Sequence, residues 1–192
     1  MPLPPPSAPR ELKHTRNIQI EILSREDELW DIDARFTEVK TYDFPLTNFM
    51  IPAGRPVHDF WLRLTIDPKG TVVEAIAVFD QEPFPGHCSL IHENYRKLIG
   101  LNLLKGFRLG IKERLSGLEG CTHMNELAEV LPYALVQAFA FGEPETRNKT
   151  GFDKKVDNGR PWELDGCHAL RSDGPAVAEF YPRWAVKPEV KA

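Results

Sequence analysis

The sequence predicts an α+β fold, an antiparallel β-meander of four or more strands followed by helices packed on one face of the sheet. Residues 14–83 alternate apolar with polar side chains between short turn sequences, the pattern of half-buried strands. After Pro85 the apolar spacing changes to three and four residues, which is typical of amphipathic helices. Strands that precede helices along the chain define the α+β class.

Four segments carry the strand pattern: residues 17–22, 29–39, 60–66 and 71–79. Pro68 and Gly70 hold turn-forming positions between the last two strands. Short turns between consecutive strands favour antiparallel pairing. Residues 42–57 contain three prolines and a glycine, which predicts a long loop over one end of the sheet.

Three helices are expected after the strands. The first covers residues 90–99, and the second places Phe107, Ile111 and Leu115 at helical spacing. The third starts from Thr122 as its N-cap and runs to about Phe141, with a kink at Pro132.

The domain organisation follows from the same reading. Residues 1–13 form a proline-rich arm, because five of the 17 prolines fall in the first nine positions. This arm is either a frayed terminus or a segment that lies across a partner subunit. Residues 14–142 form one α+β domain, and residues 143–192 form a loop and a C-terminal tail that pack back on that domain.

Composition excludes several classes of protein. A chain of 192 residues with 42% apolar side chains is long enough for one globular core. The 24 Lys and Arg against 28 Asp and Glu argue against a nucleic-acid partner. No apolar run is long enough to span a membrane, and the start of the chain lacks the features of a signal peptide. Three cysteines favour a reducing, cytoplasmic location, and a homodimer stays open.

No strong catalytic motif is present, so the candidate site is built from residues at the ends of elements, where sites usually gather. These residues are His14, Arg16, His58, Asp59, Cys121, His123, Cys167 and His168. A helix N-terminus favours a thiolate and a neutral imidazole, which predicts a polarised pair of Cys121 and His123. The alternatives are a strand-end hydrogen bond for His58 with Asp59, and buried structural roles for Cys121 and His123.

The cysteines and histidines of this set also suggest a metal site. Cys121, His123, Cys167 and His168 offer zinc-type ligands, but their spacings are shorter than those of ordinary zinc motifs. We therefore predict no bound metal and no cofactor. One of the adjacent aromatic residues Phe60 and Trp61 is expected to line a pocket between the sheet and the helices.

Several short motifs carry a family resemblance. They include His14-x-Arg16, Leu29-Trp30-Asp31-Ile32, His58-Asp59 and, most specifically, Gly120-Cys121-Thr122-His123-Met124-Asn125-Glu126-Leu127. Together they resemble the bacterial domain of unknown function 2889 family, over about residues 14–141 and the Cys167-His168-Ala169 segment. The resemblance implies a carbon–carbon lyase of aromatic catabolism that removes formaldehyde from a lignin-derived phenylcoumaran dimer.

Such a reaction needs a base at the γ-hydroxyl and an acidic or cationic group at the departing phenoxide, but no redox cofactor. The predicted catalytic residues are His14, His58, Asp59 and His123. The predicted substrate-binding residues are Arg16, Tyr42, Trp61, Cys121 and His168, with Arg16 or Tyr42 on the phenolate. The alternatives are a non-catalytic module that binds a small molecule or regulates a partner, and a metal-dependent enzyme that uses the cysteines and histidines.

Overall fold

A computed structural model describes residues 3–140, 144–151, 160–161 and 163–186 of the 192-residue chain. The chain divides into two compact units, residues 1–142 and 143–192, and each is described by itself.

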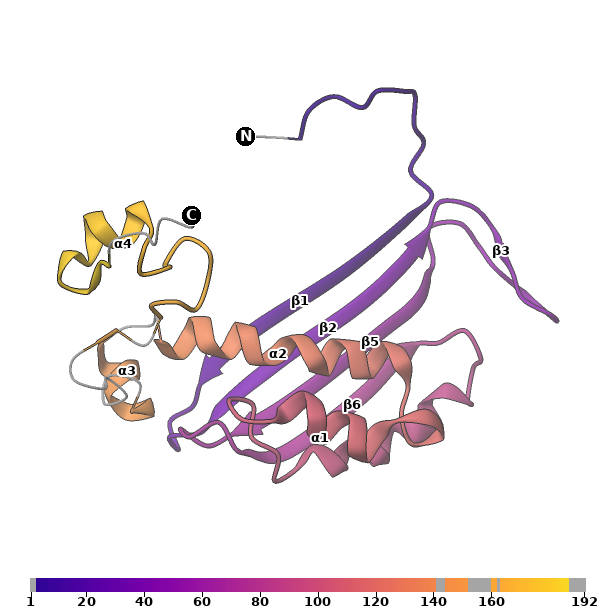
Figure 1. Ribbon diagram of the computed structural model, residues 1–192. Coiled ribbons are helices and arrows are strands. Elements are labelled where there is room, and N and C mark those ends of the chain that lie inside the picture. Colours follow the sequence, from indigo (N-terminus) through magenta and orange to yellow (C-terminus); the bar gives the residue numbers. More distant parts are fainter. Residues whose placement is uncertain (1–2, 141–143, 152–159, 162, 187–192) are drawn as a thin grey trace. The chain divides into compact units, whose positions relative to one another are not determined.

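The first unit is built on a four-stranded antiparallel sheet (Figure 1). Its strands are β1 (His14–Ser24), β2 (Trp30–Lys40), β5 (Pro56–Ile66) and β6 (Val72–Gln81), in the order β1-β2-β5-β6. This arrangement confirms the predicted meander and the α+β class. Strands β1, β5 and β6 are longer than predicted, and β5 begins early enough to include His58.

The segment between β2 and β5 is less irregular than its prolines suggested. Two short strands, β3 (Phe44–Pro45) and β4 (Met50–Ile51), pair there as a small antiparallel hairpin. The predicted loop of residues 42–57 therefore contains a hairpin, and its last two residues already belong to β5. Tyr42 lies just before β3 and is exposed.

Strand alternation divides the sheet into two unlike faces. The inner face carries apolar side chains that are almost completely buried: Ile32, Ala34, Phe36, Phe60, Leu62, Leu64 and Ile66. Because successive side chains point to opposite faces, the residues between them form the outer face. There Asp33 pairs with Arg63, and Asp59 pairs with Arg35.

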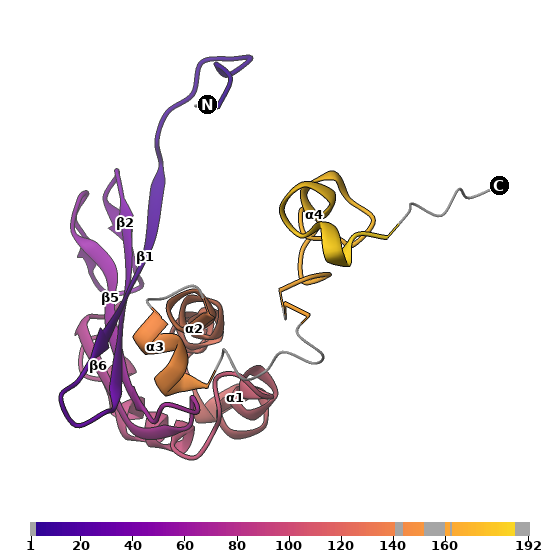
Figure 2. The same cartoon turned by 90° about the vertical axis from the view of Figure 1, so that its left-hand side faces the viewer.

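The helices cover the inner face only (Figure 2). They are the 3₁₀ segment η1 (Cys88–Leu98), α1 (Phe107–Leu115), the 3₁₀ turn η2 (Gly117–Glu119) and α2 (Thr122–Ala140). The first predicted helix is thus a 3₁₀ segment, and α2 continues through Pro132. Phe141, its predicted last residue, lies outside the described residues.

Two ring contacts fix the direction of α2 across the sheet. His123, near its start, lies 5.6 Å from the ring of Phe36, and Phe139, near its end, lies 5.1 Å from that of Trp30. The helix therefore runs antiparallel to β2. Its N-terminus lies over the end of the sheet where β1 and β5 begin and β2 ends.

The second unit contains α3 (Pro144–Thr150), α4 (Pro175–Phe180) and the 3₁₀ turn η5 (Pro182–Trp184). Within it, Asp165 accepts hydrogen bonds from the backbone and side chain of Ser172. The expected packing of residues 143–192 onto the first unit stays a prediction, as does the role of the proline-rich arm.

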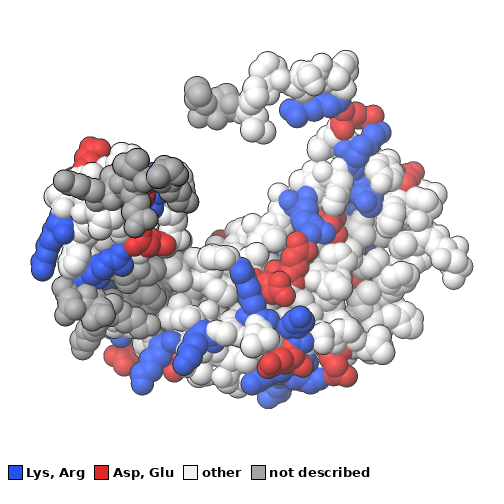
Figure 3. Space-filling view, viewed as in Figure 1, with Lys and Arg blue, Asp and Glu red and all other residues white. Residues whose placement is uncertain are grey.

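Acidic and basic side chains are interspersed on the face of the molecule that Figure 3 presents. None of the described helices has the length and apolar character needed to cross a membrane.

Candidate functional site

The site begins with one row of side chains across three neighbouring strands. Arg16 of β1 lies opposite Glu38 of β2, and Glu38 lies opposite His58 of β5. All three residues occupy positions whose side chains lie on the inner face of the sheet. Directly opposed residues in a sheet have Cβ atoms about 4.5–5.5 Å apart, so the register alone brings these side chains into contact.

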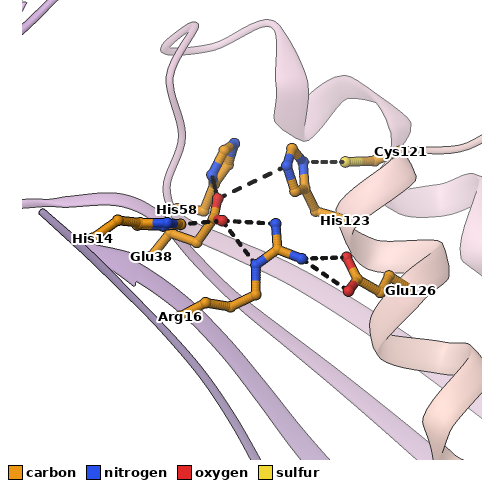
Figure 4. Close-up of polar contacts among 7 residues, drawn as sticks. All are labelled: His14, Arg16, Glu38, His58, Cys121, His123 and Glu126. Carbon is orange, nitrogen blue, oxygen red and sulfur yellow. Dashed lines mark hydrogen bonds and ion pairs between the residues drawn. The ribbon is translucent and has the colours of Figure 1, made fainter. Parts of the chain in front are cut away.

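The start of α2 completes the cluster from above the sheet (Figure 4). His123 lies with its ring centroid 4.1 Å from that of His58, and its Nε2 is 3.8 Å from Oε2 of Glu38. Glu126, one helical turn later, accepts two hydrogen bonds from Nη1 of Arg16, at 2.8 and 2.7 Å. Residues three apart share a helix face, which explains why both reach the row.

Glu38 is the centre of the cluster, and its two oxygens have different partners. Oε1 accepts a hydrogen bond from Nε of Arg16 at 2.9 Å, and it lies 2.7 Å from Nη2 of Arg16 and 3.2 Å from Nε2 of His14. Oε2 lies 2.7 Å from Nδ1 of His58 and faces His123. One carboxylate therefore lies within 4 Å of one guanidinium and three imidazoles.

The side chains of the cluster differ in how far they are exposed to solvent. Glu38 and His58 are only 7% and 8% exposed, whereas the side chain of His123 is 30% exposed. The inner part of the cluster is therefore shielded, and the His123 ring connects it to the surface.

The electrostatics follow from burial and contact. Burial raises the pKa of Glu38, but the hydrogen bonds from Arg16 and His58 outweigh it and hold that pKa below its ordinary value. Burial, followed by the neighbouring His123, lowers the pKa of His58 in spite of Glu38. The hydrogen bond to Glu38 raises the pKa of Arg16. The site thus favours an ionised carboxylate beside a neutral His58.

The Gly-Cys-Thr-His stretch positions His123 through the start of α2. The first helical hydrogen bond runs from the Asn125 N–H to the Cys121 carbonyl, so Cys121, not the predicted Thr122, occupies the N-cap. Sγ of Cys121 lies 3.9 Å from Nδ1 of His123. A Cβ on Gly120 would lie 2.3 Å from the carbonyl oxygen of Leu115, which leaves no room for another residue there.

The hydroxyl group of a buried tyrosine holds the start of α2 in place. Tyr95 is fully buried, its hydroxyl oxygen accepts the Cys121 N–H at 2.9 Å, and its O–H donates to the side chain of Asn125 at 2.9 Å. Asn125 in turn donates to the Leu115 carbonyl. The helix N-terminus, and with it His123, is therefore held by a hydrogen-bonded core.

The structure brings together five of the predicted residues, His14, Arg16, His58, Cys121 and His123. It does not bring Asp59 or Trp61 to them, because these residues lie on the outer face. Asp59 accepts two hydrogen bonds from Arg35, and Trp61 donates to Asp80 and lies under the Arg35 guanidinium.

Three further predicted residues lie elsewhere. Tyr42 is 43% exposed, and the ammonium group of Lys40 lies 5.7 Å from its ring. Cys167 and His168 belong to the second unit, so the alternative of a four-residue zinc set with Cys121 and His123 stays open.

Two acidic residues of the cluster, Glu38 and Glu126, are not among the site residues predicted from the sequence. Glu38 had a readable signal, since it follows Trp30, Ile32, Ala34 and Phe36 at alternate positions of β2. An acidic residue that continues an inward-facing apolar series has to be paired when buried. Glu126 follows His123 by three residues, within the most specific motif.

The cluster can exchange protons, and it can also bind a cation. Glu38, His58 and His123 each offer one donor atom, and these three atoms lie within 4.8 Å of one another. The protein is thus an α+β domain with a buried carboxylate–histidine cluster where the sheet meets α2.

Residues 14–137 match the family described as "Protein of unknown function (DUF2889)", and the chain belongs to this family. The matched region includes every residue of the cluster. No curated protein and no solved structure matches the chain.

Proposed function

We propose that the protein is a cofactor-independent lyase that acts on a hydrophobic aromatic small molecule by acid–base chemistry. The observation that carries this proposal is the contact between Glu38 and His58, at 2.7 Å, with the His123 ring beside it. A carboxylate that holds one nitrogen of an imidazole fixes the ring and supports proton uptake at the other nitrogen.

The proposed substrate class is a phenylcoumaran-type dimer with a γ-hydroxymethyl group, as the family resemblance implies. His58, oriented through Nδ1 by Glu38, takes the γ-hydroxyl proton at Nε2. The bond between the β and γ carbons breaks, formaldehyde leaves, and an α,β double bond forms. The aryl ether bond at the α carbon breaks at the same time, and the imidazolium form of His123 gives its proton to the departing phenoxide. The proton taken by His58 then passes to the neighbouring ring of His123 and restores both groups. No electron acceptor is needed, because the reaction is redox-neutral.

This scheme changes the roles expected from the sequence. The carboxylate that orients His58 is Glu38, since Asp59 is bound to Arg35 on the other face. Arg16 already donates to two carboxylates, so it positions Glu38 and is no longer the candidate phenolate ligand. His123 takes over the leaving group because it is the more exposed imidazole of the pair.

A hollow with a mixed apolar and charged lining lies at the same end of the sheet. It measures about 220 Å³, and Phe49, Met50, Arg55 and Pro56 contribute to its lining. Pro56 is two residues before His58 on β5. The lining of the hollow also includes the charged residues Asp80 and Glu82, so a ligand there would need polar groups beside its apolar part.

The test is formaldehyde release from a phenylcoumaran dimer, compared with an analogue that lacks the γ-hydroxyl. We expect turnover of the first compound only. His58→Ala and His123→Ala should each lower kcat by about 10²- to 10⁴-fold. His92→Ala is the control, because His92 is an exposed residue of η1 outside the cluster. Absence of formaldehyde, or full activity in both cluster variants, would overturn the proposal.

A further inference from the structure

The donor atoms of Glu38, His58 and His123 lie within 4.8 Å of one another. Nδ1 of His58 and Nε2 of His123 lie 2.7 and 3.8 Å from the same oxygen, Oε2 of Glu38. Bonds of about 2.0–2.1 Å in a tetrahedral zinc site place neighbouring ligand atoms about 3.3 Å apart. The two observed distances bracket that value, so small side-chain rotations would bring all three atoms onto one ion.

We propose that Glu38, His58 and His123 bind one divalent transition-metal ion of the zinc class. Two imidazoles and one carboxylate are ligands that zinc and its neighbours accept, and three protein ligands leave a coordination position open. The inference concerns binding at this site and does not require the proposed reaction.

The partners of the other donor atoms support the assignment. Oε1 of Glu38 is held by Arg16 and His14, which leaves Oε2 for the two histidines. The second ring nitrogen of His123 lies 3.9 Å from the Cys121 sulfur. Metal ligands in proteins are commonly held by such outer contacts, which fix their orientation and increase their basicity.

The fixed charges also favour a cation. Arg16 alone would repel a metal ion, but it lies between the two carboxylates of Glu38 and Glu126. With the histidines neutral, one positive and two negative side chains leave the cluster with one net negative charge. Glu126 thus acts as a counter-charge that permits a cation beside Arg16.

Metal binding and the proposed acid–base chemistry exclude each other at this site. An ion held by Nδ1 of His58 would displace the contact to Glu38 that orients the base. An ion held by Nε2 of His123 would occupy the nitrogen nearest to that carboxylate. Zinc is therefore expected to inhibit an acid–base lyase here.

The test uses the full chain after EDTA treatment and dialysis, titrated with Zn²⁺ by calorimetry and with Co²⁺ by visible absorption. We expect one ion per chain and the strong absorption bands of low-coordinate Co²⁺. Glu38→Gln, His58→Ala and His123→Ala should each weaken binding by about 10- to 100-fold or more. Glu126→Gln should weaken it by less, and His92→Ala should leave it unchanged. Circular dichroism confirms that each variant is folded.

Two results would overturn the inference: no binding in the micromolar range, or equal binding by the wild type and by folded variants of all three ligands. The formaldehyde assay separates this failure from failure of the proposed function. Zinc binding together with no turnover by the EDTA-treated, metal-free protein refutes the lyase alone, and turnover without zinc binding refutes the metal site alone. Activity that appears only with zinc supports the metal site and refutes cofactor independence.

Discussion

The two faces of the β2–β5 pair differ in how their carboxylates are paired. On the outer face two acidic residues each have an arginine of their own, Asp33 with Arg63 and Asp59 with Arg35, in bidentate contacts of 2.5–2.9 Å. On the inner face one carboxylate, Glu38, is shared by Arg16 and three histidines.

The difference separates a structural arrangement from one that can react. Each outer pair matches one carboxylate with one permanently charged guanidinium and contains no imidazole. The inner cluster combines a buried carboxylate with imidazoles, the side chains that gain or lose a proton, or bind a metal, under physiological conditions. Because successive side chains of β5 point to opposite faces, His58 belongs to the inner cluster and the adjacent Asp59 to an outer ion pair.

The largest effect is expected from neutralising the central carboxylate. Glu38→Gln removes the charge that holds Arg16 and His58, and should lower the free energy of unfolding by about 2–3 kcal/mol. Asp33→Asn is the matched change on the outer face and should cost less than about 1 kcal/mol, because the side chain of Arg63 is half exposed. Urea denaturation of both variants measures the difference. Equal losses would contradict the contrast between the faces.

A smaller effect is expected where the core holds the start of α2. Tyr95→Phe leaves the Cys121 N–H without its acceptor and should lower the free energy of unfolding by about 1–2 kcal/mol. Tyr133→Phe is the control, because its hydroxyl contacts Arg108 at the surface; it should cost less than about 0.5 kcal/mol. If the two losses are the same, Tyr95 does not anchor the helix that carries His123.

The fold was predictable because its two periods are clear in the sequence. Alternation in residues 14–83 identified the four strands, and the change of spacing after Pro85 identified the helical half. The 3₁₀ form of η1 and the β3–β4 hairpin were missed. A strand of two residues is too short to show alternation, and apolar spacing does not separate a 3₁₀ segment from an α-helix.

The site was predictable only in part. Single histidines at element ends pointed to His14, His58 and His123, but their common partner Glu38 depends on strand register. The side of the sheet on which Asp59 and Trp61 fall depends on the same register. A shift by one residue exchanges the two faces, so proximity in sequence to His58 was a poor guide to contact.

The smallest expected effect is a difference in pH dependence between the faces, measured on EDTA-treated protein. His58 has a lowered pKa in the folded state, caused first by burial and then by His123, so the unfolded chain binds its proton more readily. Its contribution to stability is therefore complete above the unfolded pKa of about 6.5 and declines as the pH falls below it. Between pH 7 and 6 the loss should be less than about 1 kcal/mol.

The lowered pKa of Glu38 adds a second loss only at more acidic pH, as the carboxylate takes up a proton, because its ordinary value is 4.5. His58→Asn should flatten the decline between pH 7 and 6, whereas Asp33→Asn on the outer face should leave it as in the wild type. Thermal melts at half-unit steps of pH make the comparison. An equally steep decline in His58→Asn would show that the acid sensitivity arises outside the cluster, and the chemical contrast between the faces would lose its physical basis.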